Sequence, residues 1–328
     1  MKKRNQIFTL LLTVAFFAAF NLSLYGLFTR RLSNNFSGAT RAQMIDVGRF
    51  LPHAENSDLP KIDTSFTLGG DLPVLDGAAA LLPVYAAVIN NIYPEGCVTF
   101  EGGAFSDDNF YGENFADDSA MQYNNTVRGY QAVVNGATDI FFSAAPSEAQ
   151  KQYAEEKSVT LRYVPIGLEA FVFFVNQNNP VDNLTTDQIR KIYAGEYKNW
   201  SEVGGANRII NPITRLEGSG SQTAFEGFMG DCEIGQKSPF AIAGASIGFS
   251  FRYYMDGIVE NDNVKMLSLN GVYPSAENIR SRSYPIVTEF YAVYRADNDN
   301  KNIPVLIDWL LSKEGQKLIE ESGYVPIA

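Results

Sequence analysis

Short apolar segments with the character of strands alternate with amphipathic segments from about Ser65 to the C-terminus. This alternation is typical of α/β proteins, in which helices cover mostly parallel sheets. At roughly 100–200 residues per domain, 328 residues suggest two such domains. One strand-like segment ends at Leu75, and the others cover residues 98–101, 139–143, 162–176, 209–215 and 284–295. One helix-like segment ends at Ile92, and the others cover residues 127–135, 185–193, 219–229 and 303–322.

The composition is that of a globular chain with an acidic surface: 45% of the residues are hydrophobic, and the net charge is −11. Extended nucleic-acid binding needs a basic face, so the charge argues against it. Histidine-based catalysis or a histidine metal site would depend on His53 alone, which lies in a polar stretch. Cys97 and Cys232 make neither a disulfide framework nor a zinc site, and we expect two buried free thiols in different lobes.

The N-terminus has the pattern of a membrane segment. A basic cluster at residues 2–4 precedes an uncharged, mostly apolar run over residues 5–29, which Arg30 and Arg31 close. Since about 20 apolar residues span a bilayer and no small-residue cleavage site follows, we favour an uncleaved anchor at residues 7–28 over a cleaved signal. Residues 32–328 would then lie outside the cytoplasm. We expect residues 32–65 to form a polar tether.

The longest expected loop, residues 102–125, is rich in acidic residues. Asp107, Asn109, Gly112 and Asp118 match part of a calcium-loop spacing, but Tyr111 stands where an oxygen ligand is expected. A solvated acidic insertion without a metal is therefore the favoured interpretation.

The segment that carries the most chemistry runs from Arg215 to Thr223, between a strand-like and a helix-like segment. Its glycines let the backbone approach a ligand, and the free amides of the following helix start favour an anion. Ser219 and Ser221 add hydroxyl donors, while Arg215 suits bidentate contact with an oxyanion and Glu217 could hold the guanidinium in place. The alternative is an ordinary serine-capped helix after a glycine turn. The spacing fits neither a nucleotide P-loop nor a hydrolase nucleophile elbow.

Two other helix starts have a similar character. Asp76 and Gly77 lead into a helix through Ala79 and Ala80, whose amides would be unpaired. Thr126 stands at the start of another predicted helix, where its hydroxyl can cap the helix or contact a ligand. Three such starts could converge on one anion, which would allow an acidic protein to bind an anionic ligand.

In residues 66–328 the chain resembles the phosphate-binding proteins of phosphate ABC importers, members of the type II periplasmic-binding-protein group. The resemblance rests on several motifs in combination. They are Leu184-Thr185-x-x-Gln188-Ile189-x-x-Ile192-Tyr193-x-Gly195, Asn199-Trp200-x-Glu202-Val203-Gly204-Gly205, Arg215-x-Glu217-Gly218-Ser219-Gly220-Ser221 and Tyr284-Pro285-Ile286, with weaker echoes at Val164-Pro165-Ile166 and Gly323-Tyr324-Val325-Pro326.

The resemblance implies a two-lobed α/β fold with mixed sheets flanked by helices and with the second lobe inserted into the first. Lobe I would comprise residues 66–166 and 286–328, and lobe II residues 167–285. Two crossover strands, near residues 165–170 and 285–290, would join the lobes, and closure of the lobes would trap the ligand.

The family's ligand contacts can be carried over position by position, with no catalytic residue, metal or cofactor. They map to Ala79, Ala80, Thr126, Ser143, Arg215, Glu217, Ser219, Gly220 and Ser221. One position departs from the family: Ala144 stands where phosphate binders carry the aspartate that accepts the phosphate proton. This loss weakens discrimination between oxyanions but leaves the anion cradle in place.

We therefore expect a monomeric, extracytoplasmic solute-binding protein that captures phosphate or a related tetrahedral oxyanion and passes it to an ABC permease. An alternative is a binding-protein fold reused as an envelope sensor or interaction module without transport. An envelope phosphatase is disfavoured because no nucleophile and base pair is evident in the sequence.

Overall fold

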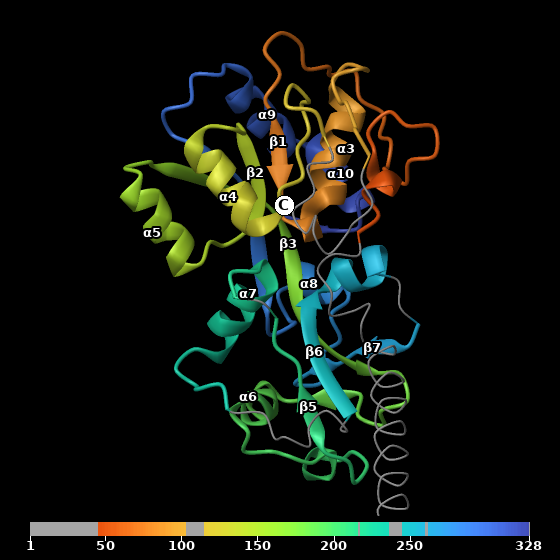
Figure 1. Ribbon diagram of the computed structural model, residues 1–328. Helices are drawn as coiled ribbons and strands as arrows, with labels where there is room; N and C mark the ends of the chain where they lie inside the picture. The colour runs from red at the N-terminus through yellow and green to blue at the C-terminus, as the bar shows by residue number, and fades with distance from the viewer. Residues whose placement is uncertain (1–44, 103–114, 216, 236–244, 260–261, 328) are drawn as a thin grey trace, which may run out of the picture.

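The computed structural model describes residues 45–102, 115–215, 217–235, 245–259 and 262–327. Two groups of elements lie at opposite ends of the molecule, and the long strand β3 runs between them (Figure 1). The first group comprises the elements up to and including β3 and those from β9 onward, and the second group comprises the elements between these two strands. The chain thus leaves the first group on β3 and returns to it on β9.

The first group is built on a sheet that α3, α4, α5, α9 and α10 cover (Figure 1). Its elements are η1 (Val47–Phe50), β1 (Leu75–Gly77), η2 (Ala79–Leu81), α3 (Leu82–Ile92), α4 (Asn125–Asn135), β2 (Ile140–Ala144), α5 (Glu148–Glu156), β3 (Leu161–Asn176), β9 (Val287–Arg295), α9 (Asn302–Leu311), α10 (Lys313–Glu321) and β10 (Val325–Pro326).

The second group extends the same sheet beyond β3. Its elements are β4 (Asn183–Leu184), α6 (Thr186–Ala194), η4 (Trp200–Val203), β5 (Ile210–Pro212), α7 (Gly220–Met229), β6 (Ala245–Phe251), the π-helix η6 (Tyr254–Val259), β7 (Val264–Met266), β8 (Ser268–Leu269) and α8 (Ala276–Arg280).

The strands pair in both directions, which confirms an α/β fold with mixed sheets. The main sheet has the order β1-β2-β9-β3-β6-β5, and β7 and β10 also pair with β3. Among the described strands only β1 with β2, β4 with β8 and β5 with β6 are parallel. The prediction of mostly parallel sheets is wrong because β3 and β9 run antiparallel to each other and to their other partners in the main sheet: β9 to β2, and β3 to β6 and β7.

The two expected crossover segments pair with each other. Gly167 of β3 lies opposite Phe290 of β9, and Ala170 lies opposite Val287. The register shifts between Pro165 and Gly167, so β3 carries a bulge where it passes from one group to the other. The lobe boundaries at residues 166, 167, 285 and 286 stay a prediction.

Two predicted elements differ from those observed. Residues 303–322 form α9 and α10 instead of one helix, because Ser312 is extended at ψ 169° and its side chain caps α10 by accepting from the Gly315 amide. Of the apolar residues that recur at helical spacing in this segment, Leu311 is exposed, and the others are buried: Ile303, Leu306, Ile307, Leu310 and Leu318. The strand expected at residues 98–101 is reduced to one bridge between Phe100 and Phe115.

Part of the expected tether packs on the first group. Ile45, Val47, Phe50 and Leu59 are buried in the core against elements that include α3. The backbone amide of His53 donates to Asn90 Oδ1 at 2.8 Å, which holds this segment against α3. Ordered structure therefore begins at least as early as residue 45.

Several expectations fall on residues outside the described part. The anchor at residues 7–28 and three calcium-loop positions, Asp107, Asn109 and Gly112, belong to these. Within the described residues, no helix has both the length and the apolar character needed to cross a bilayer, and no cluster of candidate metal ligands occurs. Both cysteines are free, but Cys232 is exposed and Cys97 is only partly buried, so the expectation of two buried thiols is wrong.

An aromatic cluster fixes α7 on the sheet of the second group. Phe225 of α7 stacks on Phe249 of β6 with ring centroids 4.3 Å apart, and both rings contact Tyr193 of α6. The Tyr193 hydroxyl donates to the carbonyls of Ile213 and Ile247. These contacts position the N-terminus of α7, which forms part of the site described below.

The bulge on β3 requires a glycine, which gives a test of the crossover packing. A Cβ on Gly167 would lie 2.3 Å from the buried Phe290 ring. We expect Gly167→Ala to lower the free energy of unfolding by about 1–3 kcal/mol in urea denaturation, because β9 or its ring must shift. Gly227→Ala is the control: it lies on α7 with nothing near its Cβ position and should be neutral or slightly stabilising. Equal effects of the two substitutions would contradict this packing.

Candidate functional site: an anion pocket between the two groups

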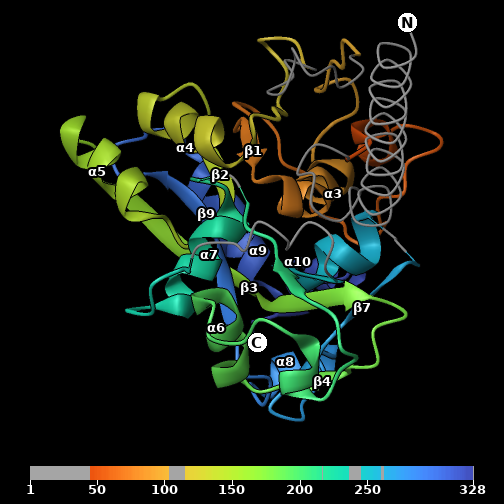
Figure 2. The same ribbon diagram turned by 60° about the horizontal axis from the view of Figure 1, so that its bottom comes forward.

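A pocket of about 390 Å³ lies where the two groups meet. Residues from three helix starts line it: those of η2, α4 and α7. In both views α4 and α7 lie on the same flank of β3 (Figures 1 and 2). The lining residues are Ala78, Ala79, Ala80, Asn125, Thr126, Arg215, Ser219, Gly220, Ser221, Ser250, Phe251 and Tyr254.

Arg215 supplies the positive charge of this pocket. Its Nη1 atom is buried and has no hydrogen-bond partner. Burial lowers the pKa of the guanidinium, and the neighbouring Tyr254, whose ring centroid is 6.0 Å from Cζ, opposes that shift. No described carboxylate forms an ion pair with Arg215. A guanidinium without a counter-charge in a partly desolvated pocket strongly favours an anionic ligand.

Glu217 does not hold the Arg215 guanidinium in place, as the sequence suggested it could. Its side chain is exposed, and it does not line the pocket. The side chain of Tyr254, not a carboxylate, lies beside the Arg215 guanidinium. The pocket therefore keeps the full positive charge of the arginine.

Gln222 holds the loop that carries Arg215. Its Oε1 accepts from the Arg215 amide at 3.0 Å, and its Nε2 donates to Glu226 Oε1 at 2.9 Å. Ser219 caps α7 by accepting from the Gln222 amide at 3.3 Å, which leaves the Ser219 hydroxyl proton free to donate. Gly218 adopts a φ of +77°, a conformation that favours glycine. Within the Gly218-Ser219-Gly220 sequence, Gly218 thus permits the turn and Ser219 caps α7.

Asp76 organises the other side of the pocket. It is fully buried, and its oxygens accept from the amide and the side chain of Asn124 and from the Gly77 amide. Burial raises the pKa of Asp76 to about 6, although these hydrogen bonds oppose the shift. Asn125 then takes a φ of +62°, and its Oδ1 accepts from the Thr126 amide. One carboxyl group therefore ties the end of β1 to the start of α4.

The starts of α4 and α7 face each other closely. A Cβ on Gly220 would lie 3.5 Å from Thr126 Oγ1. A larger residue at position 220 would therefore narrow the pocket directly beside the Thr126 hydroxyl. The expectation that helix starts from distant parts of the chain meet at one point agrees with this geometry.

The structure brings together seven of the predicted site residues and places the other two elsewhere. Ala79, Ala80, Thr126, Arg215, Ser219, Gly220 and Ser221 line the anion pocket. Ser143, at the end of β2, lines an adjoining cavity together with Ala144. Glu217 lines neither.

Sequence reasoning missed the residues that β6 and η6 contribute. Ser250 is buried at the end of β6, and Tyr254 opens the π-helix η6. The signal for β6 was present, because apolar Ile247, Phe249 and Phe251 alternate with small residues. The position of Tyr254 beside Arg215 has no comparable sequence signal.

A buried ion pair crosses between the two groups near the pocket. Arg252, which follows β6, donates to the carbonyl of Gly323 at 2.6 Å, and its Nε lies 3.5 Å from Glu169 Oε1 on β3. Glu169 also accepts from the amides of Ala170 and Tyr253. Burial raises the pKa of Glu169 to about 7 despite the charge of Arg252.

Taken together, the fold and the pocket define a two-lobed binding protein whose central pocket suits an anion. The chain belongs to the PBP superfamily, because the family model described as "PBP superfamily domain" matches residues 108–314.

The relatives carry more specific names. The chain is 28% identical over 231 residues to the phosphate-binding protein PstS of Bacillus subtilis, a match that covers 66% of this chain and 74% of the relative. It is 26% identical over 294 residues to protein SphX of Synechococcus elongatus, covering 78% of this chain and 86% of the relative.

Solved structures share the fold. One is a putative phosphate ABC transporter substrate-binding protein from Clostridium perfringens with bound phosphate, with a TM-score of 0.57, 24% identity and coverage of 77% of this chain and 98% of the other. Another is an ABC-type phosphate transport receptor from Vibrio cholerae, with a TM-score of 0.51, 21% identity and coverage of 76% and 98%.

The raised pKa of Glu169 predicts a pH-dependent stability. Because the folded pKa of about 7 exceeds the ordinary 4.5, the folded state binds this proton more tightly. The stabilisation is complete below about pH 4.5 and is lost as the pH rises through 7. Glu169→Gln removes this dependence, so the stability of the unaltered chain relative to the variant should rise by roughly 3 kcal/mol between pH 8 and pH 5 in urea titrations.

Glu155→Gln, on an exposed position of α5, is the control for the loss of a carboxylate. It should leave the pH dependence of the unfolding free energy unchanged. A stability difference between the unaltered chain and Glu169→Gln that stays constant from pH 8 to pH 5 would contradict the raised pKa.

Proposed function

We propose that this protein is an extracytoplasmic solute-binding protein that captures phosphate or a related tetrahedral oxyanion between its two lobes for an ABC importer. The observation that carries the proposal is the buried, unpartnered Nη1 of Arg215 in a pocket that three helix starts also line. Helix N-termini and an arginine are donors, and an oxyanion with several acceptor oxygens satisfies them together. These local donors outweigh the chain's net charge of −11.

The named relatives support this proposal. The Bacillus subtilis relative is a phosphate-binding protein, and the Clostridium perfringens structure is that of a putative phosphate ABC transporter substrate-binding protein with bound phosphate. The partners proposed here are accordingly phosphate and the permease subunits of an importer. A monomer, held at the outer face of the membrane by residues 7–28, would present the ligand to such a permease.

Binding would use donors from both groups of elements. Ala79, Ala80 and Thr126 belong to the first group, whereas Arg215 and Ser219 belong to the second. An anion that contacts both sides stabilises the closed arrangement, with β3 and β9 as the connection about which the groups move. This function needs no covalent step, and we propose no catalytic residue.

The unpartnered Nη1 of Arg215 also separates this proposal from the sensor or interaction alternative. A module that works without ligand has no need of a buried guanidinium that lacks a counter-charge, since such a group destabilises the protein unless an anion is bound. The pocket therefore favours ligand capture.

Calorimetric titration of the full-length protein in detergent with phosphate, sulfate, molybdate and tungstate tests the proposal. We expect saturable binding of phosphate that Arg215→Ala weakens at least about 10-fold, because a charge-assisted hydrogen bond is lost. Arg215→Lys should recover part of the affinity, since it keeps the charge but not the planar fork.

Glu217→Gln serves as the control in this titration. It alters an exposed side chain outside the pocket and should change the dissociation constant by less than about 3-fold, beyond a weak long-range charge effect. If none of the four anions bound, or if Arg215→Ala left the affinity unchanged, the pocket would not be the oxyanion site.

A further inference from the structure

A second chamber of about 520 Å³ adjoins the anion pocket. Ala78, Ala80, Thr126, Gly220 and Phe251 line both cavities, so the two spaces share a wall. The chamber extends from this shared wall toward the end of β2 and the crossover strands β3 and β9. The chamber is therefore a space that a substituent on a ligand held by Arg215 could occupy.

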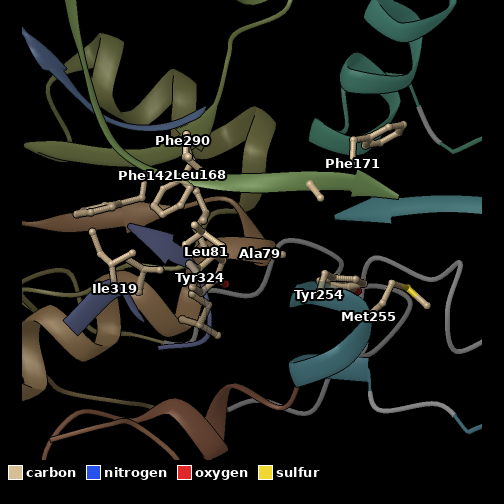
Figure 3. Close-up of a cluster of buried hydrophobic side chains, with 14 of the residues drawn as sticks. Ala79, Leu81, Phe142, Leu168, Phe171, Tyr254, Met255, Phe290, Ile319 and Tyr324 are labelled. Atoms are coloured by element: carbon tan, nitrogen blue, oxygen red, sulfur yellow. The ribbon is translucent and has the colours of Figure 1, made fainter. Parts of the chain in front are cut away.

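The walls of the chamber are mainly apolar. Leu81, Ala144, Ala145, Phe290 and Tyr324 contribute to them. Figure 3 shows Leu81, Phe290 and Tyr324 gathered beside the crossover strand β3. The Tyr324 hydroxyl already donates to the carbonyl of Ala80, which leaves its ring as the part available to a ligand. Such walls suit a carbon-bearing group better than a bare, hydrated anion.

The only charged residue that lines the chamber within the described part of the chain is Glu169. Its Oε1 accepts from the Ala170 amide at 2.8 Å, its Oε2 accepts from the Tyr253 amide at 3.3 Å, and Arg252 lies beside it. These partners hold the carboxyl group in place on β3. Ser143, Gln150, Thr223 and Thr288 also line the chamber with uncharged polar side chains, whereas Ala144 and Ala145 add only methyl groups.

The walls of the chamber favour one kind of fourth substituent on a tetrahedral phosphorus over another. Inorganic phosphate near neutral pH carries a proton that needs an acceptor when it is buried. In the dianion of a phosphate monoester or a phosphonate, a carbon-bearing substituent occupies that fourth position and needs apolar surroundings instead. The remaining oxygens accept hydrogen bonds from Arg215 and the helix starts in either case.

We propose that the chain binds an organophosphorus oxyanion: a phosphate monoester or phosphonate whose small, uncharged carbon substituent occupies the chamber beside Ala144. The proposal rests on the proposed function, in which the oxyanion lies at Arg215. It adds the class of ligand: the phosphoryl oxygens lie in the anion pocket, and the substituent packs against Leu81, Phe290 and Tyr324.

Calorimetric titrations of the full-length protein in detergent with inorganic phosphate, ethyl phosphate and propylphosphonate test this proposal at pH 7.5. We expect the better of the two organic ligands to bind at least about 10-fold more tightly than inorganic phosphate. The two organic probes distinguish an ester from a phosphonate. Phosphate binding without measurable binding of either organic ligand would overturn the proposal and leave the proposed function intact.

Ala144→Leu fills the chamber at its wall. We expect it to weaken binding of the organic ligands at least about 10-fold and to change phosphate affinity less than about 3-fold. Ala206→Leu, at an exposed position, is the matched control and should affect no ligand. A thermal denaturation curve for each variant establishes that it is folded. Equal weakening of phosphate and organic ligands by a folded Ala144→Leu would overturn the proposal.

Ala144→Asp provides a second test that does not depend on filling the space. The new carboxylate supplies an acceptor for the proton of inorganic phosphate, and it gives a carbon substituent less apolar surroundings than the methyl group of Ala144. We therefore expect the ratio of affinities to shift at least about 10-fold toward inorganic phosphate over the organic ligands. An unchanged preference would overturn the proposal. Failure of every ligand to bind the unaltered chain would instead contradict the oxyanion site at Arg215 itself.

Discussion

The antiparallel pairing of β3 with β9 is the constraint on which the rest of the structure depends. The two strands pair from Leu161 with Arg295 to Ala170 with Val287, and β3 continues into the second group, where it pairs with β6. Every element that lines the anion pocket is attached, directly or through its sheet, to this pair. The pocket forms where the elements packed on either end of β3 meet.

The electrostatics of the pocket follow from the same arrangement. Arg215 is carried by the second group, where Gln222 fixes its backbone and Tyr254 lies beside its guanidinium. The first group contributes backbone and hydroxyl donors, held in place by the buried Asp76. An aromatic neighbour in place of a carboxylate leaves the positive charge available, so a bound anion is the group that completes the site.

Much of the fold was predictable because local patterns carry it. Glycine, serine and threonine at helix starts correctly indicated α6 and α7, and the apolar run of β3 was found almost in full. The direction of the strands was not predictable from alternation alone, because β3 and β9 pair through contacts distant in sequence. The break between α9 and α10 was missed because apolar periodicity continues across Ser312, while the capping role of that residue depends on one hydrogen bond.

The site could be predicted only in part, for a related reason. Six of the seven predicted residues that line the pocket stand at helix starts, which are local features, and Arg215 lies in the loop before α7. Glu217 is close to Arg215 in sequence but exposed, whereas Tyr254 is distant in sequence and in contact. The apolar chamber was not predictable either, since its walls come from β2, β9, η2 and the segment after α10, which meet only in the folded protein.

The central claim is that one oxyanion is held between the two groups of elements, by Arg215 on one side and by the starts of η2 and α4 on the other. Anomalous diffraction from crystals of the protein grown with tungstate tests it most directly, because the metal centre marks the anion. The account predicts a single strong peak between Arg215 and Thr126, within hydrogen-bonding reach of both. A peak that contacts only one group, or a peak elsewhere on the protein, would contradict it.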